Sequence, residues 1–335
     1  MRAWQTVKTG RPAEALVLNT HAAIPEAGPG MLRLEVCAAG IGLPDALMCL
    51  GSYPLTPALP FTQGQEAVGR IDALGPGVRD RSPGQRVVAV TGFVAGHGGF
   101  ADRCLALDDF CLPVPEEMSN AEAAAFLIPM HTAYIALQRR ARLAAGETLL
   151  VLGAAGGTGS AAVQVGNALG ARVIAVAGGL DKTTYCARIG AEHVIDYRDG
   201  DLCARVLELT AGKGADVVYD PVGGATFAEA TRCVAHEGRL LVVGFASGHW
   251  GEVQVPHLVN RNYSVMGVIP SGYDRAFREA AHARLVAWWR QGTIRIMVDE
   301  IVAFEHLPSA LEKLLDRRVT GKLVLAVSSE AQRSA

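Results

Sequence analysis

From about Leu149 onward, short apolar runs alternate with segments of helical periodicity, and this alternation constrains the fold more than any other feature. The runs are TLLVLG, ARVIAVA, EHVIDY, ADVVYD, RLLVVGF and YSVMGV. Each helical segment between them ends near a glycine. Strands that are apolar on both faces are typical of a parallel sheet buried between helix layers. Six of them in β-α-β-α order predict a complete doubly wound dinucleotide-binding fold.

The first third of the chain is β-rich instead. MLRLEVCAAG, EAVGRIDALG and GQRVVAV read as half-buried strands divided by glycine and proline turns. The stretch PEEMSNAEAAAF predicts a helix that is capped by Ser119 or Asn120. From about Gly272 the pattern indicates helix, strand, helix and a closing strand. We expect this tail to rejoin the first third of the chain.

A chain of 335 residues is long enough for two domains. We expect an α/β protein with a β-rich catalytic domain, formed by residues 1–122 and 270–335, and a cofactor domain at 123–269. The net charge of -2, without a basic run, argues against nucleic acid and anionic membranes as partners. No signal peptide or membrane-spanning stretch is predicted. Seven scattered cysteines indicate reduced thiols and a cytoplasmic protein.

The turn in LLVLGAAGGTGSAAVQ is a variant of the G-x-G-x-x-G fingerprint, with Ala154, Gly156 and Gly159 at the glycine positions. It follows a strand and opens a helix, which is the context that a dinucleotide site requires. Side chains here would block a pyrophosphate from the N–H groups at the helix start. The alternative is tight helix–strand packing alone. The predicted cofactor-binding residues of the turn are Ala155, Gly156, Gly157, Thr158 and Gly159.

The second strand of the predicted sheet ends in AVAGGLDK, and this ending bears on the choice of dinucleotide. NAD sites usually place an acid there to bind the ribose 2′-hydroxyl. Gly178 and Gly179 occupy that place, and Asp181 can simply start the next helix. Lys182 is a candidate partner for a 2′-phosphate, with a solvated helix residue as the alternative. The pattern favours NADPH over NADH.

Together these motifs resemble the medium-chain dehydrogenase/reductase superfamily, in particular its zinc-free quinone oxidoreductase (ζ-crystallin-like) branch. The resemblance runs from Met1 to about Val327 and includes CAAGIGLPDAL, GSYPLTPALPFTQGQEAVG, DVVYDPVGG and TGKLVL. It implies a GroES-like catalytic domain beside a Rossmann cofactor domain. It also implies a homo-oligomer, a dimer first of all, in which YSVMGV pairs across a two-fold axis.

The resemblance allows zinc to be judged position by position. Zinc alcohol dehydrogenases have a cysteine where this chain has Gly42 and a histidine where it has Gln65. Glu66 is retained, but one carboxylate does not make a catalytic zinc site. The four-cysteine structural lobe is missing, and His97 in its region reads as a surface-loop residue. We predict no metal.

The resemblance also implies site residues. Tyr53 matches a tyrosine beside the nicotinamide, where it can position the ring or donate a proton to the substrate; an aromatic packed under a loop is the alternative. Capping, packing or surface ion pairs are the alternatives for the other implied cofactor contacts. These are Thr132, Tyr197, Phe245, Ala246, Ser247, Gly267, Val268 and Lys322, with Arg317 as an alternative to Lys322.

The chain departs from the branch at two positions. Gly42 stands where relatives commonly carry an asparagine that faces the nicotinamide pocket. Gln85 stands where an aspartate is usual, which affects a turn. Asp45 is retained and reads equally well as a turn residue or a catalytic one.

The function expected from all this is zinc-independent, NADPH-dependent reduction of quinones or small α,β-unsaturated carbonyls, so the partner is a small hydrophobic electrophile. Without a metal Lewis acid, reduction of a conjugated double bond or quinone fits better than alcohol oxidation. One alternative is an enoyl-thioester reductase, with Arg261 and Arg275 as candidate anion contacts. The other is an NADPH-binding protein with vestigial catalysis, to which the missing asparagine lends weight. The sequence leaves the proton donor and the natural substrate open.

Overall fold

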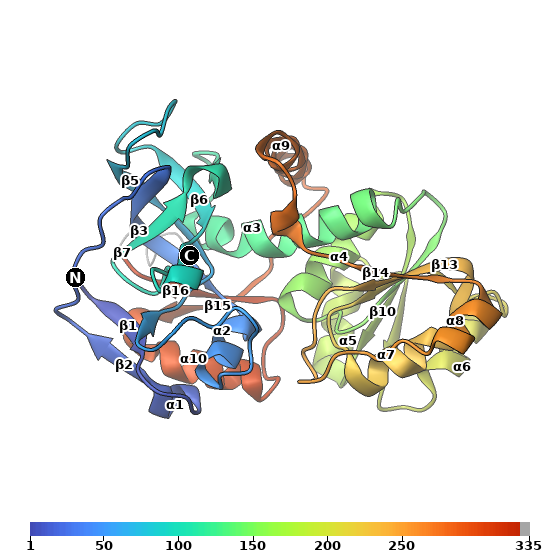
Figure 1. Cartoon of the computed structure of the whole chain (residues 1–335). Helices are drawn as coiled ribbons and strands as arrows, with labels where there is room; N and C mark the ends of the chain where they lie inside the picture. The colour runs from blue at the N-terminus through green and yellow to red at the C-terminus, as the bar shows by residue number, and fades with distance from the viewer. Residues whose placement is uncertain (329–335) are drawn as a thin grey trace. The chain divides into compact units, whose positions relative to one another are not determined.

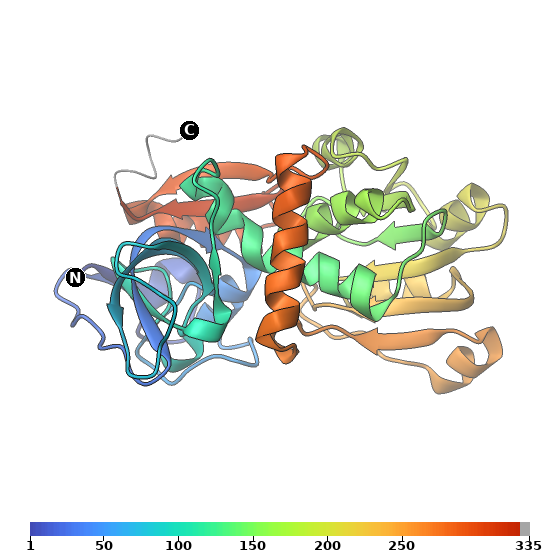
Figure 2. The ribbon, with the colours of Figure 1, turned by 90° about the horizontal axis from the view of Figure 1, so that it is seen from above.

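The computed structural model describes residues 1–328, which fall into two compact units (Figure 1). The first unit comprises Met1–Ile128 and the segment from Ile296 onward, and the second comprises Pro129–Arg295. The second unit therefore extends beyond residue 269, where the sequence pattern placed its end. The reason is a long helix, α9 (Arg275–Arg290, orange in Figure 2), which packs on the end of α3 (Asn120–Tyr134). The rings of Tyr134 and Trp288 lie 5.8 Å apart, edge to face.

The first unit is built on two sheets. The larger has the strand order β15-β16-β3-β5-β6-β8, with β7 also paired to β3, and the smaller has the order β2-β1-β4. All these pairs are antiparallel except β15 with β16. The strands are β1 (Ala3–Thr6), β2 (Leu16–Asn19), β3 (Met31–Ile41), β4 (Phe61–Thr62), β5 (Glu66–Leu74), β6 (Arg86–Val90), β7 (Arg103–Leu107), β8 (Cys111–Pro113), β15 (Val298–Ala303) and β16 (Lys322–Ala326). The helices are α1 (Pro12–Ala15), α2 (Leu43–Cys49) and α10 (Leu307–Leu315).

Strand β3 organises this unit, because its residues alternate between exposed and buried at first and are all buried from Val36 to Ile41. Its buried end lies between β5 and β16, with Gly40 opposite both Glu66 and Val324. A Cβ on Gly40 would lie 2.5 Å from Glu66 Oε1, so only glycine fits there. The end of β3 and the starts of β5 and β16 therefore meet at one place.

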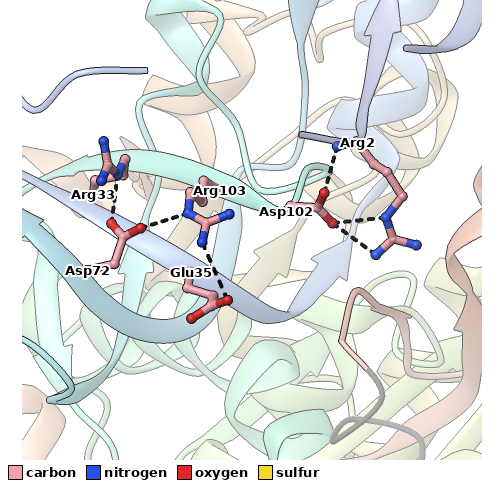
Figure 3. A network of polar contacts seen from close by, with 6 residues as sticks. All are labelled: Arg2, Arg33, Glu35, Asp72, Asp102 and Arg103. Carbon is pink, nitrogen blue, oxygen red and sulfur yellow. Dashed lines mark hydrogen bonds and ion pairs between the residues drawn. The ribbon is translucent and has the colours of Figure 1, made fainter. Parts of the chain in front are cut away.

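Charged side chains join the other half of β3 to β5 and β7 (Figure 3). Asp72 Oδ1 accepts a hydrogen bond from Arg33 Nε, and its Oδ2 accepts one from Arg103 Nε, both at 2.7 Å. Arg103 also lies 3.6 Å from Glu35. One carboxylate thus holds arginines from two neighbouring strands, which fixes the register of this part of the sheet.

The second unit contains one fully parallel sheet with the strand order β11-β10-β9-β12-β13-β14. This is the order of a complete doubly wound fold, so the prediction from the six apolar runs is confirmed. The strands are β9 (Thr148–Val151), β10 (Arg172–Ala177), β11 (His193–Asp196), β12 (Ala215–Asp220), β13 (Val234–Val242) and β14 (Ser264–Gly267). The helices between them are α4 (Gly157–Ala168), α5 (Leu180–Arg188), α6 (Leu202–Leu209), α7 (Gly224–Thr231) and α8 (Val255–Arg261).

Helix α3 begins with a capping box. The N–H of Ser119 donates to Glu122 Oε2 at 3.1 Å, and the N–H of Glu122 donates to Ser119 Oγ at 3.2 Å. Of the two predicted caps, Ser119 is therefore the one used. The helix continues past Pro129 and ends in a π-helical segment, Ile135–Arg140. In the part of the chain that the structure describes, no helix combines the length and the apolar character needed to cross a bilayer.

Candidate functional site

The carboxyl edge of the parallel sheet gathers most of the cofactor-binding residues predicted from the sequence. The glycine turn follows β9, and Gly178 follows β10. Tyr197 follows β11, and the loop 245–247 comes after β13. Strands β9 and β12 are neighbours although β10 and β11 intervene in sequence, so the connections switch direction between them. Open α/β sheets bind ligands beyond the carboxyl ends of their strands at such a switch point.

Within the glycine turn, two glycines have different tasks. A Cβ on Gly159 would lie 2.2 Å from the carbonyl oxygen of Gly153, so this glycine is required for tight strand–helix packing. Gly156 is exposed, and a Cβ there would meet only the same oxygen, at 3.4 Å. Packing therefore does not demand a glycine at 156. Its bare backbone instead leaves open the space in front of helix α4.

The start of α4 presents backbone donors to that space. Among residues 1–328, no hydrogen bond is formed by the N–H groups of Gly157, Thr158 and Gly159, while the next N–H, of Ser160, donates to Gly156 at 2.8 Å. These donors lie at the positive end of the dipole of a helix that extends over 12 residues. The arrangement suits an anionic group such as a pyrophosphate.

The end of β10 has no carboxylate of its own. The nearest acid is Asp196, at the end of β11, and backbone groups occupy both its oxygens: the N–H of Arg198 at 3.0 Å and that of Gly179 at 2.7 Å. These two hydrogen bonds hold the pKa of Asp196 below its ordinary value. Both oxygens of Asp196 thus already accept a backbone hydrogen bond.

Tyr197 and Arg198 border the two glycines that end this strand. A Cβ on Gly178 would lie 2.6 Å from the ring of Tyr197, and one on Gly179 would lie 2.7 Å from Arg198 Nη1. The Arg198 guanidinium carbon lies 6.0 Å from the centroid of the Tyr197 ring. Lys182 is in the first turn of α5, which starts directly after these glycines. Sequence reasoning missed Arg198, although a base directly after the strand-end tyrosine in VIDYR was a usable signal.

The loop after β13 is fixed to the turn after β12. The N–H of Ala246 donates to Pro221 at 3.0 Å, and that of Ser247 donates to Val222 at 2.9 Å. Phe245 packs on Trp250 with a centroid distance of 4.3 Å. Cross-links of this kind hold the backbone of 245–247 rigid at the sheet edge.

Two other predicted cofactor contacts, Gly267 and Val268, already form hydrogen bonds within the protein. The N–H of Val268 donates to Val242 at 3.1 Å, and the carbonyl of Gly267 accepts from Arg140 Nε at 3.1 Å. A carboxamide could use only the remaining backbone groups of this segment. Thr132 is buried within α3, 5% exposed, and so lies in the helix rather than at the sheet edge.

In the first unit, Asp45 is buried against the backbone at the start of α2. Its Oδ2 accepts a hydrogen bond from the N–H of Gly42 at 2.8 Å, and Oδ1 has no hydrogen-bond partner among the described residues. Burial raises the pKa of Asp45 to about 7, although the bond from Gly42 and the charge of Lys322 oppose the rise. The structural reading of Asp45 as a helix-start residue is thus correct, and it carries a proton-binding group as well.

Lys322 lies close to the same place. Its Nζ is 2.6 Å from Glu66 Oε1, and the other oxygen of Glu66 accepts a hydrogen bond from the N–H of Ile128 at 2.8 Å. A Cβ on Gly42 would lie 3.5 Å from Lys322 Nζ and 3.4 Å from Asp45 Oδ2. The predicted alternative to Lys322, Arg317, lies just after α10 with φ of +57°.

Tyr53 lies in the loop after α2, half-buried and packed on the small cluster of Met48, Phe61 and Phe93. Burial raises the pKa of its hydroxyl, and a side-chain hydrogen bond with Gln65 opposes the rise. The phenol therefore stays protonated at neutral pH and remains a hydrogen-bond donor.

The residues do not fit a zinc ion. Gly42 and Gln65 offer none of the usual zinc ligands, and the carboxylate of Glu66 is already paired with an ammonium group. Within residues 1–328, no group of three or more His, Cys, Asp or Glu side chains is placed to hold a metal. His97 is exposed in its loop.

A doubly wound sheet with an anion-binding glycine turn, in one chain with a β-rich unit that carries buried acid–base groups, defines a nucleotide-dependent dehydrogenase or reductase. Two family models match the chain: "Zinc-binding dehydrogenase" over residues 157–286 and "Alcohol dehydrogenase GroES-like domain" over residues 28–116. The second match confirms the GroES-like fold that was expected for the β-rich unit.

Comparison with known proteins shows to which family within this class the chain belongs. The chain is 36% identical over 304 residues to quinone oxidoreductase-like protein 2 of Bos taurus, covering 89% of this chain and 86% of that protein. It is 29% identical over 327 residues to quinone oxidoreductase of Sus scrofa, covering 97% of both. The crystal structure of Escherichia coli quinone oxidoreductase complexed with NADPH matches with a TM-score of 0.89 and 29% identity, over 97% of this chain and all of that one. The chain belongs to the quinone oxidoreductase branch of the medium-chain dehydrogenase/reductase superfamily.

Proposed function

We propose that this chain is a zinc-independent, NADPH-dependent reductase of quinones or small α,β-unsaturated carbonyl compounds. Membership of the quinone oxidoreductase branch supports an NADPH-dependent oxidoreductase. The observation that carries the choice of cofactor is the end of β10, where two glycines, Lys182 and Arg198 stand in place of an available acid. The two cationic side chains favour a 2′-phosphate over a free 2′-hydroxyl.

Different segments of the chain are proposed to bind different parts of NADPH. The N–H groups at the start of α4 hold the pyrophosphate, and Gly156 leaves it room. Tyr197 lies beside the adenosine ribose, and Arg198 and Lys182 take the 2′-phosphate. The loop 245–247 and residues 267–268 support the nicotinamide half. When bound, NADPH supplies a hydride to an electrophilic carbon of the substrate.

Independence from zinc follows from the side chains at the positions where zinc dehydrogenases hold the metal. Glycine and glutamine replace two ligands at 42 and 65, and Lys322 holds the remaining carboxylate. A site of this composition cannot polarise an alcohol through a metal. It favours acceptors that are already electrophilic, such as quinones and enones.

Tyr53 is proposed to donate a hydrogen bond to the substrate. Its hydroxyl stays protonated at neutral pH, because burial raises its pKa. The replacement Tyr53→Phe keeps the packing on Met48 and Phe61 but removes the donor. We expect turnover to fall by about tenfold to a hundredfold, as for loss of one positioned donor or acid. Unchanged turnover in this variant means that Tyr53 only packs beside the cofactor.

An enoyl-thioester reductase receives less support from the structure. Arg261 donates to the carbonyl of Arg232 at 2.9 Å, and Arg275 donates to Glu279 at 2.8 Å. Both candidate anion contacts are therefore engaged with their own neighbours. A vestigial, non-catalytic role predicts that NADPH binds but no acceptor is reduced.

We further propose a homodimer that forms through β14. This strand is the edge of the parallel sheet, and among residues 1–328 its one partner is β13. Nearby apolar side chains are exposed: Val255 by 61%, Val259 by 68% and Ile269 by 64%. An apolar sheet edge of this kind needs cover. Light scattering on the purified chain tests the proposal, since a monomer at micromolar concentration contradicts it.

A cytoplasmic location is proposed on the cysteines. All seven cysteines lie within the described residues, where each is buried and none is held in a disulfide. This use of cysteine is typical of a reducing compartment.

The test of the proposed function is NADPH consumption with 9,10-phenanthrenequinone, 1,4-benzoquinone, a 2-alkenal and crotonyl-CoA, each with and without EDTA, and with NADH in parallel. We expect EDTA-insensitive reduction of a quinone or alkenal that is faster with NADPH. Turnover of crotonyl-CoA alone supports the thioester alternative. NADPH binding without turnover of any acceptor supports the vestigial one.

A further inference from the structure

The first unit contains a fixed positive charge that the proposed cofactor contacts do not explain. Lys322 begins β16, and the register of β16 against β3 places it beside Gly42. Its ammonium lies 2.6 Å from Glu66. Glu66 is 1% exposed, but the Lys322 side chain retains 12% exposure. The carboxylate is thus sealed inside, while part of the Lys322 side chain remains exposed.

Gly42 leaves space next to that ammonium. A Cβ at residue 42 would lie 3.5 Å from Lys322 Nζ, so any longer side chain would compete with a ligand for the ammonium. Asp45 borders the same position, with one oxygen held by the N–H of Gly42 and the other without a hydrogen-bond partner among the described residues. The place can therefore accept a small polar atom from outside the chain, next to a cation.

We propose that Lys322 stabilises the negative charge that develops on the carbonyl oxygen of the substrate, and that Glu66 positions it for this task. The proposal rests on the reductase function above and assigns Lys322 to the substrate rather than to the cofactor. In this chain two of the positions where zinc relatives hold their metal, 42 and 66, lie beside an ammonium group instead. The Lys322 ammonium thus takes the place of the zinc ion that acts as a Lewis acid in those relatives.

The step needs only the NADPH of the proposed function, which becomes NADP⁺ on giving up its hydride, and one proton from solvent. A hydride adds to the β-carbon of an enone, the C=C electron pair moves to form an enolate, and the charge appears on the carbonyl oxygen. Lys322 donates a hydrogen bond to that oxygen, while the buried carboxylate of Glu66, 2.6 Å from Nζ, holds the ammonium in place. Water then delivers one proton to the α-carbon, and the saturated carbonyl compound leaves.

The charged groups around the Lys322 ammonium determine how strongly it attracts an enolate oxygen. Glu66 on β5 and Asp45 on α2 are the carboxyl groups that face it, and Tyr53 and Cys49 lie near Asp45. Burial raises the pKa of Asp45 to about 7, so in mildly acidic solution Asp45 is neutral and only Glu66 opposes Lys322. When Asp45 ionises, a second negative charge weakens the attraction for an enolate oxygen.

The experiment compares Lys322→Met with Lys313→Met, a matched control, since Lys313 pairs with Glu300 at the surface of the same unit. Three quantities are measured: kcat for a 2-alkenal at saturating NADPH, the Kd of NADPH, and the visible absorbance of 4-nitrophenol bound to the NADP⁺-saturated protein. The phenolate form of 4-nitrophenol mimics an enolate. Lys322→Met leaves Glu66 buried without its partner, so the double variant Lys322→Met/Glu66→Gln serves if the single one does not fold.

We expect Lys322→Met to lower kcat by about a hundredfold, as for removal of one charge-stabilising donor. The Kd of NADPH should change by less than about threefold, and the bound dye should lose its phenolate absorbance. The control should match the wild type in all three. A Kd for NADPH that rises tenfold or more, with kcat restored at saturation, makes Lys322 a cofactor ligand and overturns the proposal. Retained phenolate binding also overturns it.

The experiment distinguishes a wrong assignment of Lys322 from a wrong reductase function. If the wild type reduces no acceptor, the reductase function is wrong, and phenolate binding still tests Lys322. If the wild type turns over and Lys322→Met does so equally well, the reductase function stands and the assignment of Lys322 is wrong.

Discussion

The buried carboxyl group of Asp45 makes a strong prediction about stability and pH. Its pKa is about 7 in the folded chain, against an ordinary value of 3.8, and the main cause is burial. Between these pH values the folded chain binds a proton that the unfolded chain has released. Stability conferred by Asp45 is therefore lost as pH rises through this window. At about 1.4 kcal/mol per pKa unit, the rise from pH 5 to pH 8 removes about 3 kcal/mol.

The variant Asp45→Asn removes this dependence. Asparagine is neutral at every pH, and its carbonyl oxygen can still accept the hydrogen bond that Gly42 donates to Asp45. Its unfolding temperature relative to the wild type should therefore increase between pH 5 and pH 8. About 3 kcal/mol corresponds to roughly 6–12 °C for a unit of this size.

Differential scanning calorimetry at the two pH values measures this difference. Asp80→Asn is a suitable control, because Asp80 is exposed in a turn with φ of +59°, a conformation that asparagine also accepts. For the control, the difference from the wild type should stay constant with pH. The reasoning is refuted if the difference for Asp45→Asn also stays constant or becomes smaller at pH 8.

Further predictions concern the cofactor site. Gly156→Asp should abolish NADPH binding but leave the unfolding temperature within about 2 °C of the wild-type value, because the position is open but faces the anion site. Retained binding in a fluorescence titration contradicts this. Gly159→Ala should instead lower the unfolding temperature, since its Cβ would lie 2.2 Å from Gly153. Arg198→Ala should raise the KM for NADPH by about tenfold and leave that for NADH unchanged, as expected for loss of one charge-assisted contact; equal effects on both cofactors rule out a 2′-phosphate contact.

Local patterns made much of this fold predictable. The six apolar runs become the six strands of the parallel sheet, because strands buried on both faces have few other solutions. The helix start was predicted with Ser119 or Asn120 as its cap, and Ser119 is the one that caps it. The order of the strands, by contrast, rested on the resemblance and on general rules of connection.

Other features depend on contacts that no local pattern reveals. Lys322 and Glu66 are far apart in the sequence, and only the positions of β5 and β16 on either side of β3 bring them together. The pKa of Asp45 depends on burial by surrounding elements. Helix α9 was assigned to the wrong unit, because its contacts with Tyr134 are formed in space and leave no trace in periodicity. The different tasks of Gly156 and Gly159 likewise required coordinates.

The most direct test of the central claim follows a labelled hydrogen. The chain is incubated with NADPH that carries deuterium at C4 and with a 2-alkenal in the presence of EDTA, and the product is analysed by mass spectrometry and NMR. The account predicts a saturated aldehyde with deuterium on its β-carbon. NADPH consumption without deuterium in the product, or loss of the reaction on adding EDTA, would contradict it.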